Sequence, residues 1–178
     1  MPPSSRLGVQ LTQVTTALRE LGASYALIGG LALAPHHVIR ATRDVDLLVD
    51  AEKAEEVDAK LAELGYRCMY RSADAGNYQR GDERIDLIYA HRPIAKRLLT
   101  GATELNTSLG AVRVISPEGL IGFKLQGLVN DPRRTQDLED IRALLKANRG
   151  HLRLSELREY FELFDRGPLL DELLRETS

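Results

Sequence analysis

Residues 40–50 read Arg-Ala-Thr-Arg-Asp-Val-Asp-Leu-Leu-Val-Asp, and this stretch decides the fold of the chain. From Asp44 onward acidic and aliphatic residues alternate, a period of two that predicts a β-strand over residues 44–50 with one buried face. On such a strand Asp44 and Asp46 project from the same face. Two neighbouring carboxylates repel each other unless a cation lies between them, and Mg²⁺ prefers hard oxygen ligands. An isolated Asp-x-Asp is common, however, and its plainer interpretation is an exposed strand edge or a loop.

The flanking segments strengthen the interpretation as a site. Residues 25–28 form an apolar run that ends in Gly29-Gly30, which predicts a buried strand, a tight turn and the first turn of a helix at residues 31–34. Backbone N–H groups in such a turn can approach an anion closely, although a purely structural turn is the commoner meaning of Gly-Gly.

Downstream, residues 84–89 read Arg-Ile-Asp-Leu-Ile-Tyr and predict a second strand with Asp86 in an apolar setting. A carboxylate there needs a partner or a metal ion. If this strand pairs with residues 44–50, Asp86 joins Asp44 and Asp46. A phosphate-binding turn and three carboxylates are what two-metal phosphoryl or nucleotidyl transfer requires.

The remaining pattern predicts an α+β protein with a mixed β-sheet flanked by helices. Helices are expected over residues 7–21, 51–64 and 93–99, and strands over 66–71, 76–80, 83–90 and 111–115, with a hairpin turn at Gly81-Asp82. Ser116-Pro117-Glu118 has the residues of a helix start, and it opens a series of helices at residues 117–130 and 135–147, from Ser155 and from Pro168. We therefore expect an α/β core at residues 1–115 and a helical C-terminal segment at residues 116–178 packed on it.

Composition narrows the function classes. The chain has 178 residues, 43% hydrophobic and 28% charged, which excludes wholesale disorder. The 24 basic and 26 acidic residues give a formal charge of −2, which argues against a nucleic-acid footprint over the whole surface. Cys68 is the single cysteine, so an intrachain disulfide or a cysteine-based zinc site is excluded, and we expect this residue in the core. Because no apolar stretch approaches 18 residues and none follows the N-terminus, we expect a cytoplasmic protein without membrane association.

Three segments together resemble a known superfamily: Ile-Gly-Gly-Leu-Ala-Leu at residues 28–33, Arg-Ala-Thr-Arg-Asp-Val-Asp-Leu-Leu-Val at 40–49 and Arg-Ile-Asp-Leu-Ile at 84–88. They are similar to the minimal nucleotidyltransferases, which are related to the polymerase-beta type. The AbiEii-type toxins of toxin–antitoxin systems look nearest, and the aminoglycoside and lincosamide nucleotidyltransferases more distant. Residues 115–124, Arg133-Arg134 and residues 137–140 resemble the family's second motif. The resemblance covers about residues 7–145.

The resemblance implies a role for each site residue. Asp44 and Asp46 would bind Mg²⁺ or Mn²⁺ that bridges the triphosphate of a nucleoside triphosphate, and Asp86 would complete the second metal site or accept a proton from the attacking hydroxyl. The nucleotide itself would be held by Gly29, Gly30, Thr42, Arg43 and Lys124. Leu31 stands where many members of the family have a serine that helps to hold phosphate, which leaves full catalytic competence open.

Several of these residues also have a plainer interpretation. Arg43 can pair with Asp44, Lys124 can be a solvated side chain, and His36 and His37 are expected as surface or packing residues. Asp137 and Asp140, one helical turn apart, are expected to brace Lys124 or Arg133 and Arg134 rather than to bind metal.

The sequence leaves the acceptor open between a tRNA, a protein and a small molecule. Four cations without nearby acids, Arg142, Lys146, Arg149 and Arg153, favour a nucleic acid unless they are a solvated helix end. The first ninety residues carry 10 basic and 13 acidic side chains, and acids such as Asp50, Glu52, Asp82 and Glu83 suit a cationic small molecule. An antitoxin is a possible partner, and a non-catalytic nucleotide- or partner-binding module is the alternative to an enzyme.

Overall fold

The computed structural model describes residues 5–178, which form two compact units. Unit 1 contains the described residues up to Ala32 together with Ala41–Ile115, and unit 2 contains Leu33–Arg40 and Ser116–Ser178. The expectation about the N-terminus rests partly on residues 1–4, which lie outside this range. In the part of the chain described, no helix is both long and apolar enough to span a membrane.

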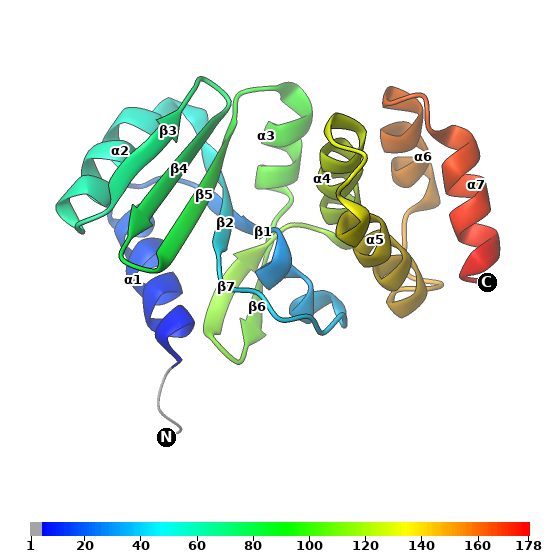
Figure 1. Cartoon of the computed structure of the whole chain (residues 1–178), viewed down its shortest axis with the longest axis horizontal. Helices are drawn as coiled ribbons and strands as arrows, with labels where there is room; N and C mark the ends of the chain where they lie inside the picture. The colour runs from blue at the N-terminus through cyan, green and yellow to red at the C-terminus, as the bar shows by residue number, and fades with distance from the viewer. Residues whose placement is uncertain (1–4) are drawn as a thin grey trace. The chain divides into compact units, whose positions relative to one another are not determined.

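Unit 1 is built on one mixed sheet whose strand order is β3-β4-β5-β2-β1-β7-β6 (Figure 1). Two pairs are parallel, β2 with β5 and β1 with β7, and the other pairs are antiparallel. The central strands β5 and β2 therefore begin at the same end of the sheet, where β1 ends. The strands are β1 (Tyr25–Ile28), β2 (Val45–Asp50), β3 (Arg67–Arg71), β4 (Ala75–Arg80), β5 (Glu83–Ala90), β6 (Thr103–Thr107) and β7 (Gly110–Val114).

Three helices flank this sheet: α1 (Arg6–Glu20), α2 (Ala54–Glu63) and α3 (Pro93–Thr100). In Figure 1, α1 and α2 lie on one side of the sheet and α3 on the other. The core of unit 1 is mainly aliphatic, with four buried tyrosines, Tyr25, Tyr66, Tyr78 and Tyr89. Alternate residues of β2 and β5 are 0–3% exposed, namely Val45, Leu47, Val49, Ile85, Leu87 and Tyr89. This burial confirms the predicted two-residue period and leaves Asp46 and Asp86 on the other face.

Unit 2 consists of four helices and the short segment Leu33–Arg40: α4 (Pro117–Asn130), α5 (Thr135–Ala147), α6 (Leu154–Leu163) and α7 (Gly167–Glu176). The Ser116 side chain accepts a hydrogen bond from the backbone N–H of Gly119, so the predicted start of α4 is confirmed. The segment Leu33–Arg40 is held to the helices of unit 2 by Asn148, whose side chain donates a hydrogen bond to the backbone carbonyl of His36. His36 is buried and His37 is exposed, as packing and surface residues would be.

Four local features differ from the expectations. Residues 30–36 form two separate 3₁₀ turns, Gly30–Ala32 and Ala34–His36, in place of an α-helical turn, because Pro35 lacks an N–H to continue a helix. Strand β6, rich in polar residues and mostly exposed, went unpredicted. The predicted strand 44–50 begins one residue later, at Val45. Cys68 is exposed, because β3 is an edge strand with a register shift between Cys68 and Tyr70.

Candidate active site

A row of residues crosses four strands of unit 1 where β1 ends and β2 begins. The parallel β2–β5 ladder places Asp46 directly opposite Asp86, so the pairing on which the sequence argument depended is present for Asp46, whereas Asp44 lies before the strand. Ile28 lies opposite Asp46 on β1, and Asn77 lies opposite Asp86 on β4. Residues opposite one another in a ladder share a face, so the carboxylates of Asp46 and Asp86 are neighbours on the half-exposed face.

Gly29 allows the Asp46 carboxylate to lie against the turn that follows β1. Its φ of +64° is in the left-handed region that side chains disfavour. A Cβ atom at this position would overlap Oδ2, Cγ and Cβ of Asp46. Glycine is therefore required at this position both by the positive φ and by the closeness of Asp46. Its backbone lies next to the Asp46 carboxylate.

Asp86 has a hydrogen-bond partner from the adjacent strand. The Asn77 amide Nδ2 donates to Asp86 Oδ1 over 2.5 Å. This bond engages one carboxylate oxygen, and among residues 5–178 the second oxygen of Asp86 has no hydrogen-bond partner. Sequence analysis missed Asn77, although the two-residue turn at Gly81-Asp82 pairs Arg80 with Glu83 and, counting back, Asn77 with Asp86.

The other predicted site residues of unit 1 lie near this row in the chain but outside its ladder. Thr42, Arg43 and Asp44 occupy the irregular segment before β2, with Arg43 exposed and the other two half-buried. Gly30 is buried at the start of the first 3₁₀ turn, and Leu31 after it is half-buried. A three-residue 3₁₀ turn supplies no helix dipole of the strength assumed for a helical N-terminus.

The Asp46–Asp86 pair suits a divalent cation that a substrate helps to hold. Among residues 5–178, no group of three or more His, Cys, Asp or Glu side chains is arranged to bind a metal ion. Mg²⁺, however, is often bound through one or two carboxylates, with waters and substrate phosphates as the remaining ligands. Two adjacent hard-oxygen donors on a half-exposed face fit that mode of binding.

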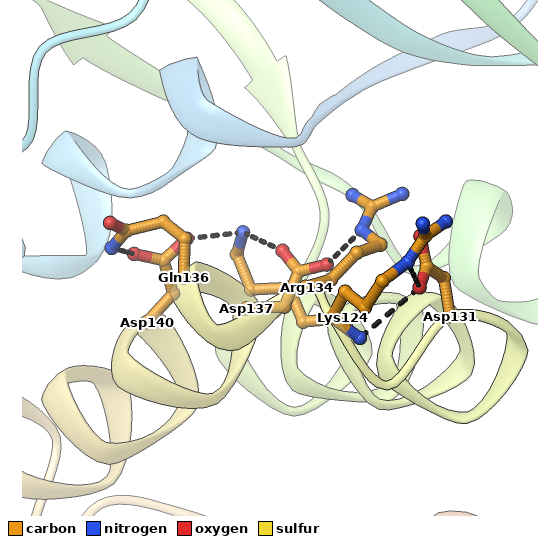
Figure 2. Close-up of polar contacts among 7 residues, drawn as sticks. Lys124, Asp131, Arg134, Gln136, Asp137 and Asp140 are labelled. Atoms are coloured by element: carbon orange, nitrogen blue, oxygen red, sulfur yellow. Dashed lines mark hydrogen bonds and ion pairs between the residues drawn. The ribbon is translucent and has the colours of Figure 1, made fainter.

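Lys124 belongs to unit 2, where it forms the centre of a buried charge cluster (Figure 2). Its side chain is only 6% exposed, and its Nζ lies 2.6 Å from Asp140 Oδ2 and 3.3 Å from Asp137 Oδ1. Arg134 Nε donates to Asp137 Oδ2 over 2.6 Å, and Gln136 donates to Asp140 Oδ1. The expectation that the two aspartates brace Lys124 and Arg134 is confirmed.

Arg40 adds a further charge to this cluster. Its Nε is buried and makes no hydrogen bond, yet it lies 3.4 Å from Asp140 Oδ1. We regard this contact as an ion pair with poor hydrogen-bond geometry, because the charges attract at that distance whatever the N–H direction. Three cations thus surround the two aspartates.

Two of the four cations in the predicted basic run at residues 142–153 are paired with acidic side chains. Arg142 pairs with Glu139 and Glu176, and Arg153 pairs with Glu118 and Glu156. The helix α5 ends at Ala147, so Arg149 does not continue its face. The sequence could not reveal Glu118 and Glu176 as partners, because they are distant along the chain, whereas Glu139 and Glu156 lie three residues from the arginines they contact.

The sequence of the chain matches a known protein family. The profile of a family described as uncharacterised nucleotidyltransferase matches residues 4–162, most of the chain. The chain belongs to this nucleotidyltransferase family. The prediction of a nucleotidyltransferase is thereby confirmed, and the nearness to the AbiEii-type branch stays a prediction. A search of curated protein sequences found no match.

Solved structures show the nucleotidyltransferase fold at low sequence identity. The antibiotic-resistance factor ANT(2'')-Ia is 20% identical, with a TM-score of 0.72 over 95% of this chain and 97% of that one. The lincosamide antibiotic adenylyltransferase LnuA, bound to lincomycin, is 18% identical, with a TM-score of 0.60 over 78% and 96%. An antigenic nucleotidyltransferase-like protein from Paracoccidioides brasiliensis is 20% identical, with a TM-score of 0.57 over 97% and 93%. The predicted α+β class with a mixed sheet and flanking helices is confirmed.

Proposed function

We propose that this chain is an Mg²⁺-dependent nucleotidyltransferase, also active with Mn²⁺, that transfers a nucleoside monophosphate from a nucleoside triphosphate to a hydroxyl group. The observation that carries the proposal is the register that sets Asp46 beside Asp86, with the Gly29 peptide against the Asp46 carboxylate. The match to a nucleotidyltransferase family supports it. Two adjacent carboxylates, with no larger metal-binding group among residues 5–178, suit a reaction in which the nucleotide supplies part of the metal's ligand set.

Each candidate site residue of unit 1 has a specific role in this proposal. Asp46 and Asp86 would hold the divalent cation. Asp44, in the segment before β2, forms no three-carboxylate group with them among the described residues and stays a third carboxylate of the proposal only. The bound cation neutralises negative charge on the phosphates and the leaving pyrophosphate. As the alternative to binding the cation, the second oxygen of Asp86 can accept the proton of the acceptor hydroxyl while the hydroxyl oxygen attacks the α-phosphorus and pyrophosphate leaves. Gly29 and Gly30 offer backbone N–H groups to phosphate oxygens, and Thr42 and Arg43 add a hydroxyl and a positive charge.

For the acceptor we favour a small molecule with hydroxyl and amino groups. The excess of acids over bases in the first ninety residues disfavours RNA and suits a cationic acceptor. The antibiotic-resistance factor ANT(2'')-Ia and the lincosamide antibiotic adenylyltransferase LnuA share the fold of this chain, which supports testing aminoglycosides and lincosamides first.

Thermal unfolding with each of the four nucleoside triphosphates, with and without Mg²⁺, tests the nucleotide site. At a ligand concentration a hundred times Kd, binding adds about 2.7 kcal/mol. For a chain of this size we expect the Tm to rise by roughly 5–11 °C. The rise should require Mg²⁺ and should disappear in Asp46→Asn, whereas Asp82→Asn, an exposed control on the hairpin turn, should retain it. A wild-type chain that shows no Mg²⁺-dependent rise with any nucleotide would contradict the proposal.

Measuring pyrophosphate release with different acceptors distinguishes a small-molecule acceptor from tRNA, and an enzyme from a non-catalytic binding module. We expect release with an aminoglycoside or lincosamide and none with bulk tRNA. Release only with tRNA would overturn the small-molecule acceptor and keep the enzyme. Nucleotide binding without release for any acceptor would favour the non-catalytic binding module.

An AbiEii-type toxin is the second candidate role, supported by the motif resemblance alone. Expression of the wild-type chain should then arrest growth, and Asp46→Asn should relieve the arrest. An antitoxin encoded beside the gene would be the partner to seek. Harmless expression of active wild-type protein would count against a toxin.

A further inference from the structure

Asn77 stands out as a half-buried amide, on the strand next to Asp86, that none of the motifs includes. It lies directly opposite Asp86 in the antiparallel β4–β5 ladder, and its Nδ2 is 2.5 Å from Asp86 Oδ1. A carboxylate only accepts hydrogen bonds, so the amide must present its NH₂ group to Asp86. We propose that Asn77 is a positioning residue that orients the Asp86 carboxylate for the divalent cation; this inference rests on the proposed function.

The hydrogen bond fixes the rotation of the carboxylate. A free Asp side chain turns about its terminal torsion at little cost, since that torsion is broad. With Oδ1 held by Asn77, the Asp86 carboxylate plane is set, and Oδ2 is the oxygen left for the cation or for a proton. Partners that bond to metal-binding carboxylates act in this way, and their loss typically lowers metal affinity or activity about 10- to 100-fold.

If the Asn77–Asp86 bond served only to hold β4 and β5 together, its loss would lower stability and leave cation affinity unchanged. The β4–β5 ladder has six paired positions and a tight two-residue turn, so it does not depend on one side-chain bond. The neighbouring Gln79, two residues along β4, offers a matched control because it points to the same side of the sheet and its Nε2 donates to the Gly81 carbonyl of its own turn. Both positions are half-buried amides.

The experiment measures cation affinity directly, with no turnover. Mn²⁺ is titrated into the wild-type chain, Asn77→Ala and Gln79→Ala in the presence of a non-hydrolysable nucleoside triphosphate analogue, and free Mn²⁺ is followed by electron paramagnetic resonance. We expect Asn77→Ala to raise the Mn²⁺ dissociation constant about 10- to 100-fold and Gln79→Ala to leave it within about twofold. The Tm of metal-free Asn77→Ala should fall by no more than about 4 °C.

Steady-state kinetics and a conservative variant complete the test. Asn77→Ala should raise the half-saturating Mg²⁺ concentration of pyrophosphate release while the nucleotide KM at saturating Mg²⁺ changes little. Asn77→Ser, which keeps a hydrogen-bond donor, should recover part of the Mn²⁺ affinity. Equal Mn²⁺ affinity in Asn77→Ala and wild type would overturn the inference while the proposed function stands. If the wild-type chain binds no Mn²⁺ with the nucleotide analogue, both the proposed function and this inference fail.

Discussion

Gly29 combines a positive φ with a close approach to the Asp46 carboxylate of the candidate site. Gly22 and Gly29 have nearly the same positive φ, +65° and +64°, but only Gly29 has atoms of another residue where a Cβ would lie. Gly22 follows α1 and faces open space. The two glycines therefore separate the energy of a strained backbone from the effect of displacing the Asp46 carboxylate.

Gly22→Ala and Gly29→Ala form a matched pair of variants. A left-handed non-glycine residue costs about 1–2 kcal/mol, so both variants should lose about that much unfolding free energy. Gly29→Ala should lose more, because its methyl group must push Asp46 aside, and it alone should abolish the Mg²⁺-dependent Tm rise with nucleotide. Urea unfolding and thermal shift measure the two effects. Nucleotide binding by Gly29→Ala at wild-type affinity would mean that the turn is no part of the site.

At the scale of elements, buried charges hold the helices of unit 2 together. Lys124 on α4 and the aspartates on α5 are nearly inaccessible to water, with side-chain exposures of 3–8%. The first turn of α4 is tied to the start of α6 by Glu118, which accepts hydrogen bonds from the backbone and guanidinium of Arg153. Each contact joins helices whose apolar faces alone would allow sliding.

Lys124→Met tests whether this lysine acts mainly within the cluster. Removing it leaves Asp137 and Asp140 buried with weaker compensation, and breaking a buried ion pair costs about 3–5 kcal/mol. We expect a loss of that size in urea unfolding, largely restored when Asp137→Asn and Asp140→Asn are added. If the restored triple variant binds nucleotide as wild type does, the predicted nucleotide contact of Lys124 is wrong. If stability returns and binding does not, that contact is supported.

The Glu118–Arg153 contact predicts a pH dependence of stability. Burial alone would raise the pKa of Glu118, but the hydrogen bonds from Arg153 outweigh it and hold the pKa below its ordinary value of 4.5. Because the folded pKa is lower than the unfolded one, this stabilisation is present above about pH 4.5 and is lost as the pH falls through the folded pKa. Glu118→Gln should therefore lower the unfolding free energy at pH 7, with a smaller difference from wild type at pH 3. An equal difference at both pH values would argue against the charged contact.

At the scale of the whole molecule, the balance of charge decides which partners are attracted. The formal charge is −2, and two of the four cations in the predicted basic run carry ion pairs. Binding of nucleic acid without sequence preference depends on unpaired cations that replace counterions on phosphates.

We therefore expect weak binding of bulk tRNA, with a dissociation constant above about 10⁻⁴ M at physiological salt. Fluorescence anisotropy with labelled tRNA over a range of salt concentrations measures it. Micromolar affinity with a steep salt dependence would show that unpaired cations gather on a surface in a way that net charge conceals. Lys146→Glu combined with Arg149→Glu would then locate that surface.

The sequence by itself determined the class of the fold and the central strands. The alternation around residues 44–50, the Gly-Gly turn and the Gly81-Asp82 hairpin are local signals, because period, turn chemistry and capping depend on residues close together in the chain. The sequence raised the meeting of Asp86 with Asp46 and of Lys124 with two aspartates, but only the tertiary structure decided that these groups meet. It alone revealed Asn77 on Asp86. It also decided that Cys68 is exposed and that Arg142 and Arg153 are paired. Strand order and helix packing bring together residues that are distant in sequence, and no local pattern specifies those distances.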